Sequence, residues 1–211
     1  MSNLSGSARS GSRCTLLIGK LPAISRHFPR VYYFTCSYKI YFWEYVNMMF
    51  NKPDPDRIKT VGPDRACAEW VLRNGGKVVW ANGKALADYN SLPPDSEAVP
   101  KVAEIDGSES SISHYGFPHL DGCVELWKIT LHDNKYIDDR AMKGLEHGKE
   151  ALKHLQVSKC VNVTDEGLKD LISLSKLQTL VLYNLPSVNK LEECTQIIVN
   201  KLPNCKIIGN A

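Results

Sequence analysis

The feature that most constrains this chain is a repeat of apolar positions in its C-terminal half. Leu152, Leu155, Val157 and Cys160 define the spacing. The spacing recurs 25 residues later at Leu177, Leu180, Leu182 and Leu185, and 26 residues earlier at Leu126, Ile129 and Leu131, with Asn134 at the cysteine position. A unit of this length cannot bury its apolar face alone, so stacked copies are expected to share one continuous core.

Within each copy, the order of residues predicts a strand, a turn and a helix. The alternating leucines of LxxLxL suit a short strand that points them into the core. Cys160 and Asn134 then lie inward at the turn, where a small side chain can serve backbone amides or carbonyls. Thr164 and Asp138 are placed to cap the helix that follows. Cys160 is therefore predicted to be structural rather than a reactive thiol.

The full pattern is that of a leucine-rich repeat of the cysteine-containing kind. One further step toward the N-terminus, the sequence VAEIDG places Ala103 and Ile105 in the strand positions. The predicted fold class is α/β, a short leucine-rich-repeat solenoid of about four repeats over residues 101–211. Residues 44–100 are predicted to form a helical N-terminal cap domain, because the terminal repeats of such stacks need a cap.

Local patterns place the main elements of that cap. Gly62 and Pro63 suit the cap and the first turn of a helix, and the glycine pair at 75–76 suits its end. The sequence KVVW at 77–80 is expected to be a strand, and SLPPDS at 91–96 a loop.

The segment YKIYFWEYVNMMF at 38–50 is aromatic nearly all round. It allows two interpretations. One is a helix that closes the open end of the repeat stack. The other is a contact with a membrane interface through Tyr41, Trp43 and Tyr45. The two interpretations are compatible with each other.

Charge is distributed unevenly along the chain. Residues 1–43 hold six lysines and arginines and no acidic residue, a composition typical of a mitochondrial transit peptide, with a disordered basic tail as the alternative. The rest of the chain holds 20 basic and 23 acidic residues, so nucleic-acid binding is disfavoured. No uninterrupted apolar run of about 18 residues suggests a transmembrane helix.

Residues with catalytic or metal-binding chemistry form no recognisable site in the sequence. The seven cysteines lack CxxC spacing, which argues against a disulfide framework and a structural zinc site. His114, His119, Cys123 and His132 match no standard ligand spacing. Neither a G-x-S-x-G elbow nor a phosphate-binding loop is present. The sequence therefore predicts a protein that is not an enzyme.

Several blocks carry a resemblance to a known family. FNKPDPDRIKTVGPDRACAEWVLRNGGKV and DYNSLP, with the series YIDD, NVTDEGL and NLPSV, are similar to the mitochondrial ATP synthase subunit s family, also called coupling factor B. The resemblance runs from about residue 41 to residue 208. A sister family, the distal membrane-arm assembly components of respiratory complex I, shares a looser version of the GPDRACAEW block.

The resemblance implies import into mitochondria and peripheral binding at the matrix face of the inner membrane. It also implies a non-catalytic coupling factor, which binds the membrane sector of ATP synthase, supports proton conduction and limits a proton leak. The alternative is an assembly factor for the membrane arm of complex I. A ubiquitin-ligase substrate receptor would also use cysteine-containing repeats, but residues 1–60 show no convincing F-box pattern.

The resemblance further implies a magnesium ion held by backbone carbonyls. The matching positions are Gly62 in VGPDR and Pro94 in SLPPD, where the family often has threonine. A crystallisation ion is the alternative, because Mg²⁺ prefers waters and carboxylates. One departure concerns redox control, because the family's Cys-x-Cys pair is replaced here by His132 and Asn134. Dithiol control is therefore not expected.

The strand face of a repeat stack is a preformed binding surface. Lys128, Thr130 and Gln156 alternate with the predicted core positions and are candidate partner-binding residues. Trp43 of the aromatic segment is a fourth candidate, and Val181 continues the same face on the next strand.

Overall fold

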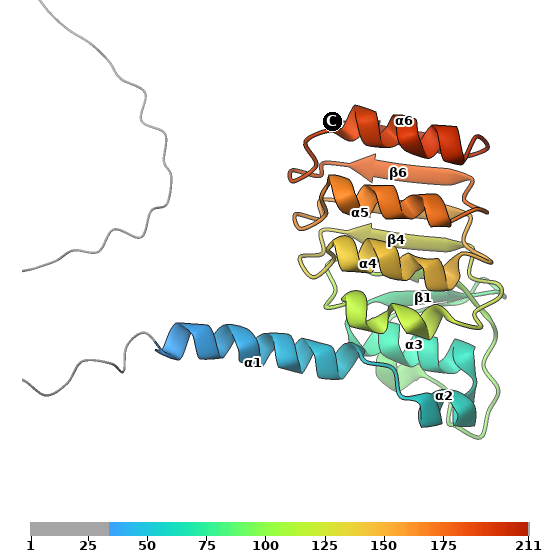
Figure 1. Cartoon of the computed structure of the whole chain (residues 1–211). Coiled ribbons are helices and arrows are strands. Elements are labelled where there is room, and N and C mark those ends of the chain that lie inside the picture. The colour runs from blue at the N-terminus through green and yellow to red at the C-terminus, as the bar shows by residue number, and fades with distance from the viewer. Residues whose placement is uncertain (1–33, 211) are drawn as a thin grey trace, which may run out of the picture. The chain divides into compact units, whose positions relative to one another are not determined.

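The computed structural model describes residues 34–210 of the chain (Figure 1). Most of the predicted leader, residues 1–33, lies outside this range. The helices are α1 (Phe34–Asn51), α2 (Pro55–Val61), α3 (Pro63–Arg73), α4 (Asp139–Gly144), α5 (Asp165–Asp170) and α6 (Leu191–Lys201). Short 3₁₀ helices are η1 (Tyr89–Ser91), η2 (His114–Leu120), η3 (Leu145–Gly148) and η4 (Leu171–Ser173).

A single seven-stranded sheet runs through the body, in the order β2-β1-β3-β4-β5-β6-β7. The strands β3 to β7 are parallel, whereas β1 is antiparallel to both β2 and β3. Helices α3 to α6 lie on one face of this sheet (Figure 1). The strands are β1 (Lys77–Trp80), β2 (Ala85–Leu86), β3 (Val102–Asp106), β4 (Lys128–His132), β5 (His154–Ser158), β6 (Thr179–Tyr183) and β7 (Lys206–Asn210). The α/β class predicted from the sequence is confirmed.

The predicted apolar positions pair with one another across the parallel strands. Ile129 stands opposite Leu155, which stands opposite Leu180 in the next strand. All three side chains are buried, so the period of the sequence matches the register of the sheet. The pairing of β3 with β4 differs from this pattern, because Ile105 rather than Ala103 stands opposite Ile129. The strand predicted from VAEIDG exists and contains both Ala103 and Ile105, but it pairs with β4 two residues away from the 26-residue period.

The backbone repeats together with the sequence. Just past the strand ends, Asp133, Lys159 and Asn184 have positive φ angles of 50°, 53° and 51°, and Glu109 has a φ of 52°. The amide of Asp133 donates to the carbonyl of Ser158, and the amide of Lys159 donates to that of Tyr183. This left-handed residue turns the chain out of the strand and joins each turn to the next strand.

The predicted role of the turn residue is confirmed by its hydrogen bonds. The side-chain amide of Asn134 donates to the backbone carbonyls of Gly107 and Ile112, and its oxygen accepts from the amide of Tyr136 at 2.9 Å. At the same place in the next unit, the single hydrogen of the Cys160 thiol lies within hydrogen-bonding distance of the carbonyls of Leu131 and Ser158. Both side chains are buried and serve the backbone of the turn.

Aspartates connect each helix to the turn that follows it. The carboxylate of Asp139 accepts from the backbone amide and the hydroxyl of Thr164, at 2.8 and 2.7 Å. Asp165 accepts from the amides of Asn189 and Lys190. The predicted caps are also in place, since Asp138 accepts from the amide of Ala141 and Thr164 from that of Glu166. Leu191 stands at the corresponding position of the last helix.

The N-terminal region follows its local patterns closely. Helix α3 begins at Pro63 with Gly62 as its cap, and strand β1 occupies the predicted positions 77–80. The boundary at residue 100 stays a prediction, and the sheet continues across it because β1 pairs with β3.

Helix α1 covers the aromatic segment and is anchored at its C-terminal end. Asn51 is fully buried, and its side chain bonds to Trp70, Asn74, Ser111 and Ser113. Phe42, Trp43 and Tyr45 remain more than half exposed. In the described range, 34–210, no helix has the length and apolar character needed to cross a bilayer.

Candidate functional site

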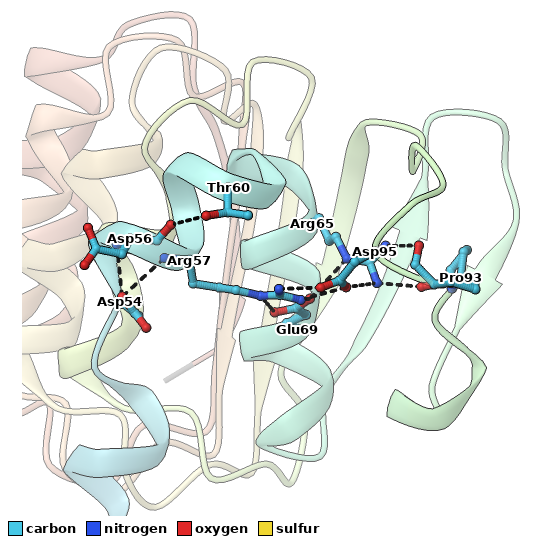
Figure 2. Close-up of polar contacts among 9 residues, drawn as sticks. Asp54, Asp56, Arg57, Thr60, Arg65, Glu69, Pro93 and Asp95 are labelled. Carbon is cyan, nitrogen blue, oxygen red and sulfur yellow. Dashed lines mark hydrogen bonds and ion pairs between the residues drawn. The ribbon is translucent and has the colours of Figure 1, made fainter.

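Two arginines and two carboxylates form an ion cluster beneath the loop at 93–95 (Figure 2). Arg57 of α2 contacts both oxygens of Glu69 and both oxygens of Asp95, with distances of 2.5 to 3.0 Å. Arg65 of α3 contacts Glu69 at 3.1 Å and Asp95 at 2.9 Å. The hydrogen bonds from Arg57 hold the pKa of Asp95 below its usual value. The cluster therefore ties the loop to both helices.

Arg65 also binds the backbone of that loop. Its guanidinium donates to the carbonyl of Pro93 at 2.5 Å and to the carbonyl of Pro94 at 3.2 Å. The Pro94 carbonyl also accepts from the amide of Glu97 at 3.0 Å. A carbonyl oxygen has two lone pairs, and both are engaged. Pro94 therefore does not fit as a magnesium ligand unless one of these hydrogen bonds is displaced.

The other predicted magnesium ligand is less constrained. The Gly62 carbonyl accepts one hydrogen bond, from the amide of Ala66 at 3.1 Å, and so retains a free lone pair. Gly62 itself has a φ of 85°, which favours glycine at this junction of α2 and α3. Magnesium binding by the pair stays a prediction.

The block GPDRACAEW makes a second connection, to strand β3. The carboxylate of Asp64 is buried, and it accepts from the Lys101 ammonium and from the backbone amide of Val102, both at 2.9 Å. Asp64 thus connects α3 to the start of β3, whereas Arg65 and Glu69 connect α3 to the loop at 93–95 and to α2. This block is recognisable in the sequence, whereas Arg57 and Asp95 were not predicted as site residues because no periodic pattern marks them.

Three of the four predicted partner-binding residues lie together on the open face of the sheet. Thr130 stands opposite Gln156 in the register of β4 and β5, and Lys128 precedes Thr130 by two positions on the same face. All three are half-buried. The ammonium of Lys128 pairs with Glu104 at 2.9 Å and lies 5.7 Å from the centre of the Trp127 ring. This face therefore presents a row of polar side chains beside an exposed indole.

The fourth predicted residue, Trp43, lies elsewhere, on α1. It is 64% exposed and lines a groove of about 830 Å³ between α1, the start of η2 and the turns that follow β4 and β5. Tyr115, Tyr136 and Lys135 line the same groove. A groove of this volume is in the usual range for ligand pockets, which is roughly 300–1,000 Å³.

The histidines and cysteines considered as metal ligands have separate environments. His119 stacks on Trp70 with ring centres 5.3 Å apart, and its burial lowers its pKa to about 4. His132 instead contacts the hydroxyl of Ser158 at 2.7 Å. Among residues 34–210, His, Cys, Asp and Glu side chains form no group of three suited to a metal ion.

Comparison with known proteins decides the family. The chain is 40% identical over 171 residues to ATP synthase subunit s, mitochondrial, of Rattus norvegicus, an alignment that spans 79% of this chain and 86% of that protein. The protein of the same name from Homo sapiens is 36% identical over the same shares. The chain belongs to the mitochondrial ATP synthase subunit s family. No protein-family profile matches the chain.

A more distant relative has a different name. Distal membrane arm assembly component 2 of Drosophila melanogaster is 27% identical over 161 residues, which span 74% of this chain and 56% of that protein. The resemblance predicted from the sequence is thus confirmed for the subunit s family, and the sister family is also similar to the chain.

Proposed function

We propose that the chain is a non-catalytic accessory subunit of mitochondrial ATP synthase. Its identity of 40% to the rat subunit s, over 86% of that protein, is the observation that carries the proposal. The chain would bind the membrane sector, support proton conduction and limit proton leak. It would act as a peripheral protein on the matrix side of the inner membrane.

We infer that the C-terminal half is a leucine-rich-repeat solenoid closed at one end by the N-terminal helices. The support is the matched strand register, the left-handed residue after each strand from β3 to β6 and the repeated turn residue at Asn134 and Cys160. In such a stack the open face of the sheet is available to a partner protein. Lys128, Thr130 and Gln156 are the residues we assign to that contact.

A pull-down of the tagged protein from mitochondria in mild detergent tests this assignment. Gln156→Arg places a long charged side chain on the open face, and we expect it to reduce recovery of ATP synthase membrane-sector subunits at least tenfold. Gln196→Arg makes the same change on the exposed surface of α6 and serves as the matched control. Equal recovery with both variants would exclude the open face as the binding surface.

The assembly-factor alternative has one specific observation in its favour, the similarity to the Drosophila protein. The same pull-down separates the two functions. Recovery of complex I membrane-arm intermediates, with ATP synthase at background, would replace the accessory-subunit proposal.

Trp43 is assigned to the membrane contact. Its exposed indole, next to Phe42 and Tyr45, suits the interface between water and lipid. Flotation with vesicles of phosphatidylcholine and cardiolipin tests this role. We expect Trp43→Ala to reduce vesicle binding, whereas Trp127→Ala, at a second exposed indole, serves as the matched control. Unchanged binding of Trp43→Ala would remove the tryptophan from this role.

A further inference from the structure

We propose that Arg65 supplies the cation that closes the loop at 93–95 over α2 and α3, so that closure of this loop does not depend on a divalent ion. The proposal concerns how the fold is held, and it is independent of the partner assigned above.

The position of Arg65 is that of a buried, fully coordinated cation. Its side chain is only 6% exposed. Four oxygens surround the guanidinium, contributed by Glu69, Asp95 and the carbonyls of Pro93 and Pro94. A guanidinium carries five N–H donors in a fixed planar fork, which matches such a set of carboxylate and carbonyl oxygens. These are also the ligand types that a hard divalent cation prefers.

Charge balance in the cluster leaves little need for a further cation. Arg57 and Arg65 contribute two positive charges, and Glu69 and Asp95 contribute two negative charges. A divalent ion on the Pro94 carbonyl would lie beside the Arg65 guanidinium, which donates to that same oxygen at 3.2 Å. Two cations at such short range repel each other, and the Arg65 guanidinium cannot move away without losing its buried contact with Glu69.

Arg57 is the second arginine that binds the two carboxylates of the cluster. Arg57 reaches Asp95 from α2 and Glu69 from α3, and Arg65 contacts the same two carboxylates. Figure 2 shows both guanidinium groups converging on Glu69 and Asp95. Both arginines bind both carboxylates, so without Arg65 the buried Glu69 would keep only Arg57 as a partner. The carbonyls of Pro93 and Pro94 would lose their hydrogen bonds to α3.

Hydrogen–deuterium exchange of the full chain in residues 91–99 tests the proposal. We expect the exchange of this loop to be the same in EDTA and in millimolar MgCl₂ at matched ionic strength. Arg65→Gln removes the cation, and we expect exchange in the loop to rise at least tenfold in both buffers. Arg140→Gln, which removes an arginine paired with Asp138 on the surface of a repeat, is expected to leave the loop unchanged.

Two results would overturn the proposal. One is faster loop exchange of the unmodified chain in EDTA, which would show that a divalent ion closes the loop. The other is loop exchange in Arg65→Gln that matches Arg140→Gln. If Arg65→Gln fails to fold, Arg65→Lys retains the charge without the planar fork and is expected to give an intermediate exchange rate. The EDTA comparison on the unmodified chain needs no variant.

Discussion

The indole nitrogen of Trp70 donates a hydrogen bond to the side-chain oxygen of Asn51 at 3.0 Å, and this contact fixes the end of α1 on α3. The same oxygen accepts from the backbone amide of Ser113 at 3.0 Å. A single buried side chain therefore joins the aromatic helix, the helix of the GPDRACAEW block and the segment that leads into η2.

Asn51→Ala should destabilise the protein strongly. The change leaves the Trp70 indole and the Ser113 amide as buried donors without acceptors, and we expect a loss of about 2–4 kcal/mol in the free energy of unfolding. Urea unfolding followed by tryptophan fluorescence measures this loss. Asn47→Ala, one turn earlier, removes a single exposed bond to Ser111 and should cost less than about 1 kcal/mol. Equal losses for the two variants would contradict the anchoring role of Asn51.

Lys159→Gly should stabilise the protein. Lys159 has a φ of 53°, and the left-handed conformation costs a residue with a Cβ atom more than it costs glycine. After the greater unfolded-state entropy of glycine is subtracted, we expect a gain of about 0.5–1 kcal/mol. Lys153→Gly, at an exposed lysine that is not among the positive-φ residues, should instead destabilise. Thermal unfolding of both variants gives the signs, and a loss for Lys159→Gly would refute the prediction.

His119 should make the protein less stable in mild acid. Its pKa of about 4 in the folded protein lies below the ordinary value of 6.5, mainly because burial disfavours the charged ring. Between these two values the unfolded chain binds a proton that the folded chain does not. Stability should therefore fall by about 2–3 kcal/mol as the pH falls from 6.5 to 4, and by only ~0.4 kcal/mol more from this group below pH 4.

His119→Phe keeps a ring against Trp70 and removes the titration. The difference in unfolding free energy between this variant and the unmodified chain should change by about 2–3 kcal/mol across the same pH window. Urea midpoints measured from pH 4 to pH 7 provide this comparison. Parallel curves for the two proteins would show that His119 does not cause the acid sensitivity.

The five buried cysteine thiols of the described residues should be unreactive in the native state. Hydrogen bonding with Cys123 and burial raise the pKa of Cys67 well above its ordinary value, and burial raises the pKa of Cys160. Thiolate is the reacting species, so both changes slow modification. In a Cys14→Ser, Cys36→Ser chain, we expect a disulfide reagent to modify the remaining five cysteines only as fast as the protein unfolds. Rapid modification of Cys67 or Cys160 before unfolding would contradict this expectation.

The repeated half of the fold was predictable because one physical requirement recurs in each unit. Each unit needs inward-facing apolar residues, a small turn residue and a capping side chain, so these residue types recur at a fixed spacing in the sequence. That spacing was sufficient to predict the strands around Ile129, Leu155 and Leu180. The first unit was predicted less well. Its strand β3 pairs with β4 two residues away from the 26-residue period of the sequence. On the other side of β3, the register of the antiparallel strand β1 shifts between Val79 and Trp80.

The candidate sites divide in the same way. Alternation along a strand was sufficient to place Lys128, Thr130 and Gln156 on one face. The contact between Arg57 and Asp95 depends instead on how the loop that carries Asp95 folds back onto α2. The spacing of residues in the sequence does not predict such a contact. Asn51 is likewise a single polar residue at the end of an aromatic helix, and its buried hydrogen-bond partners are too distant in the sequence to be predicted from it.

The aspartates that connect consecutive units give the stack a direction. Asp139 and Asp165 each reach forward to the turn of the following unit, and Leu191, at the corresponding position of the last helix, has no carboxylate to extend. The last unit thus receives an aspartate contact and provides none, so its loss deprives no earlier unit of an aspartate. Unfolding should begin at α6 and β7 and advance toward β3, one unit at a time, and refolding should run in the reverse order.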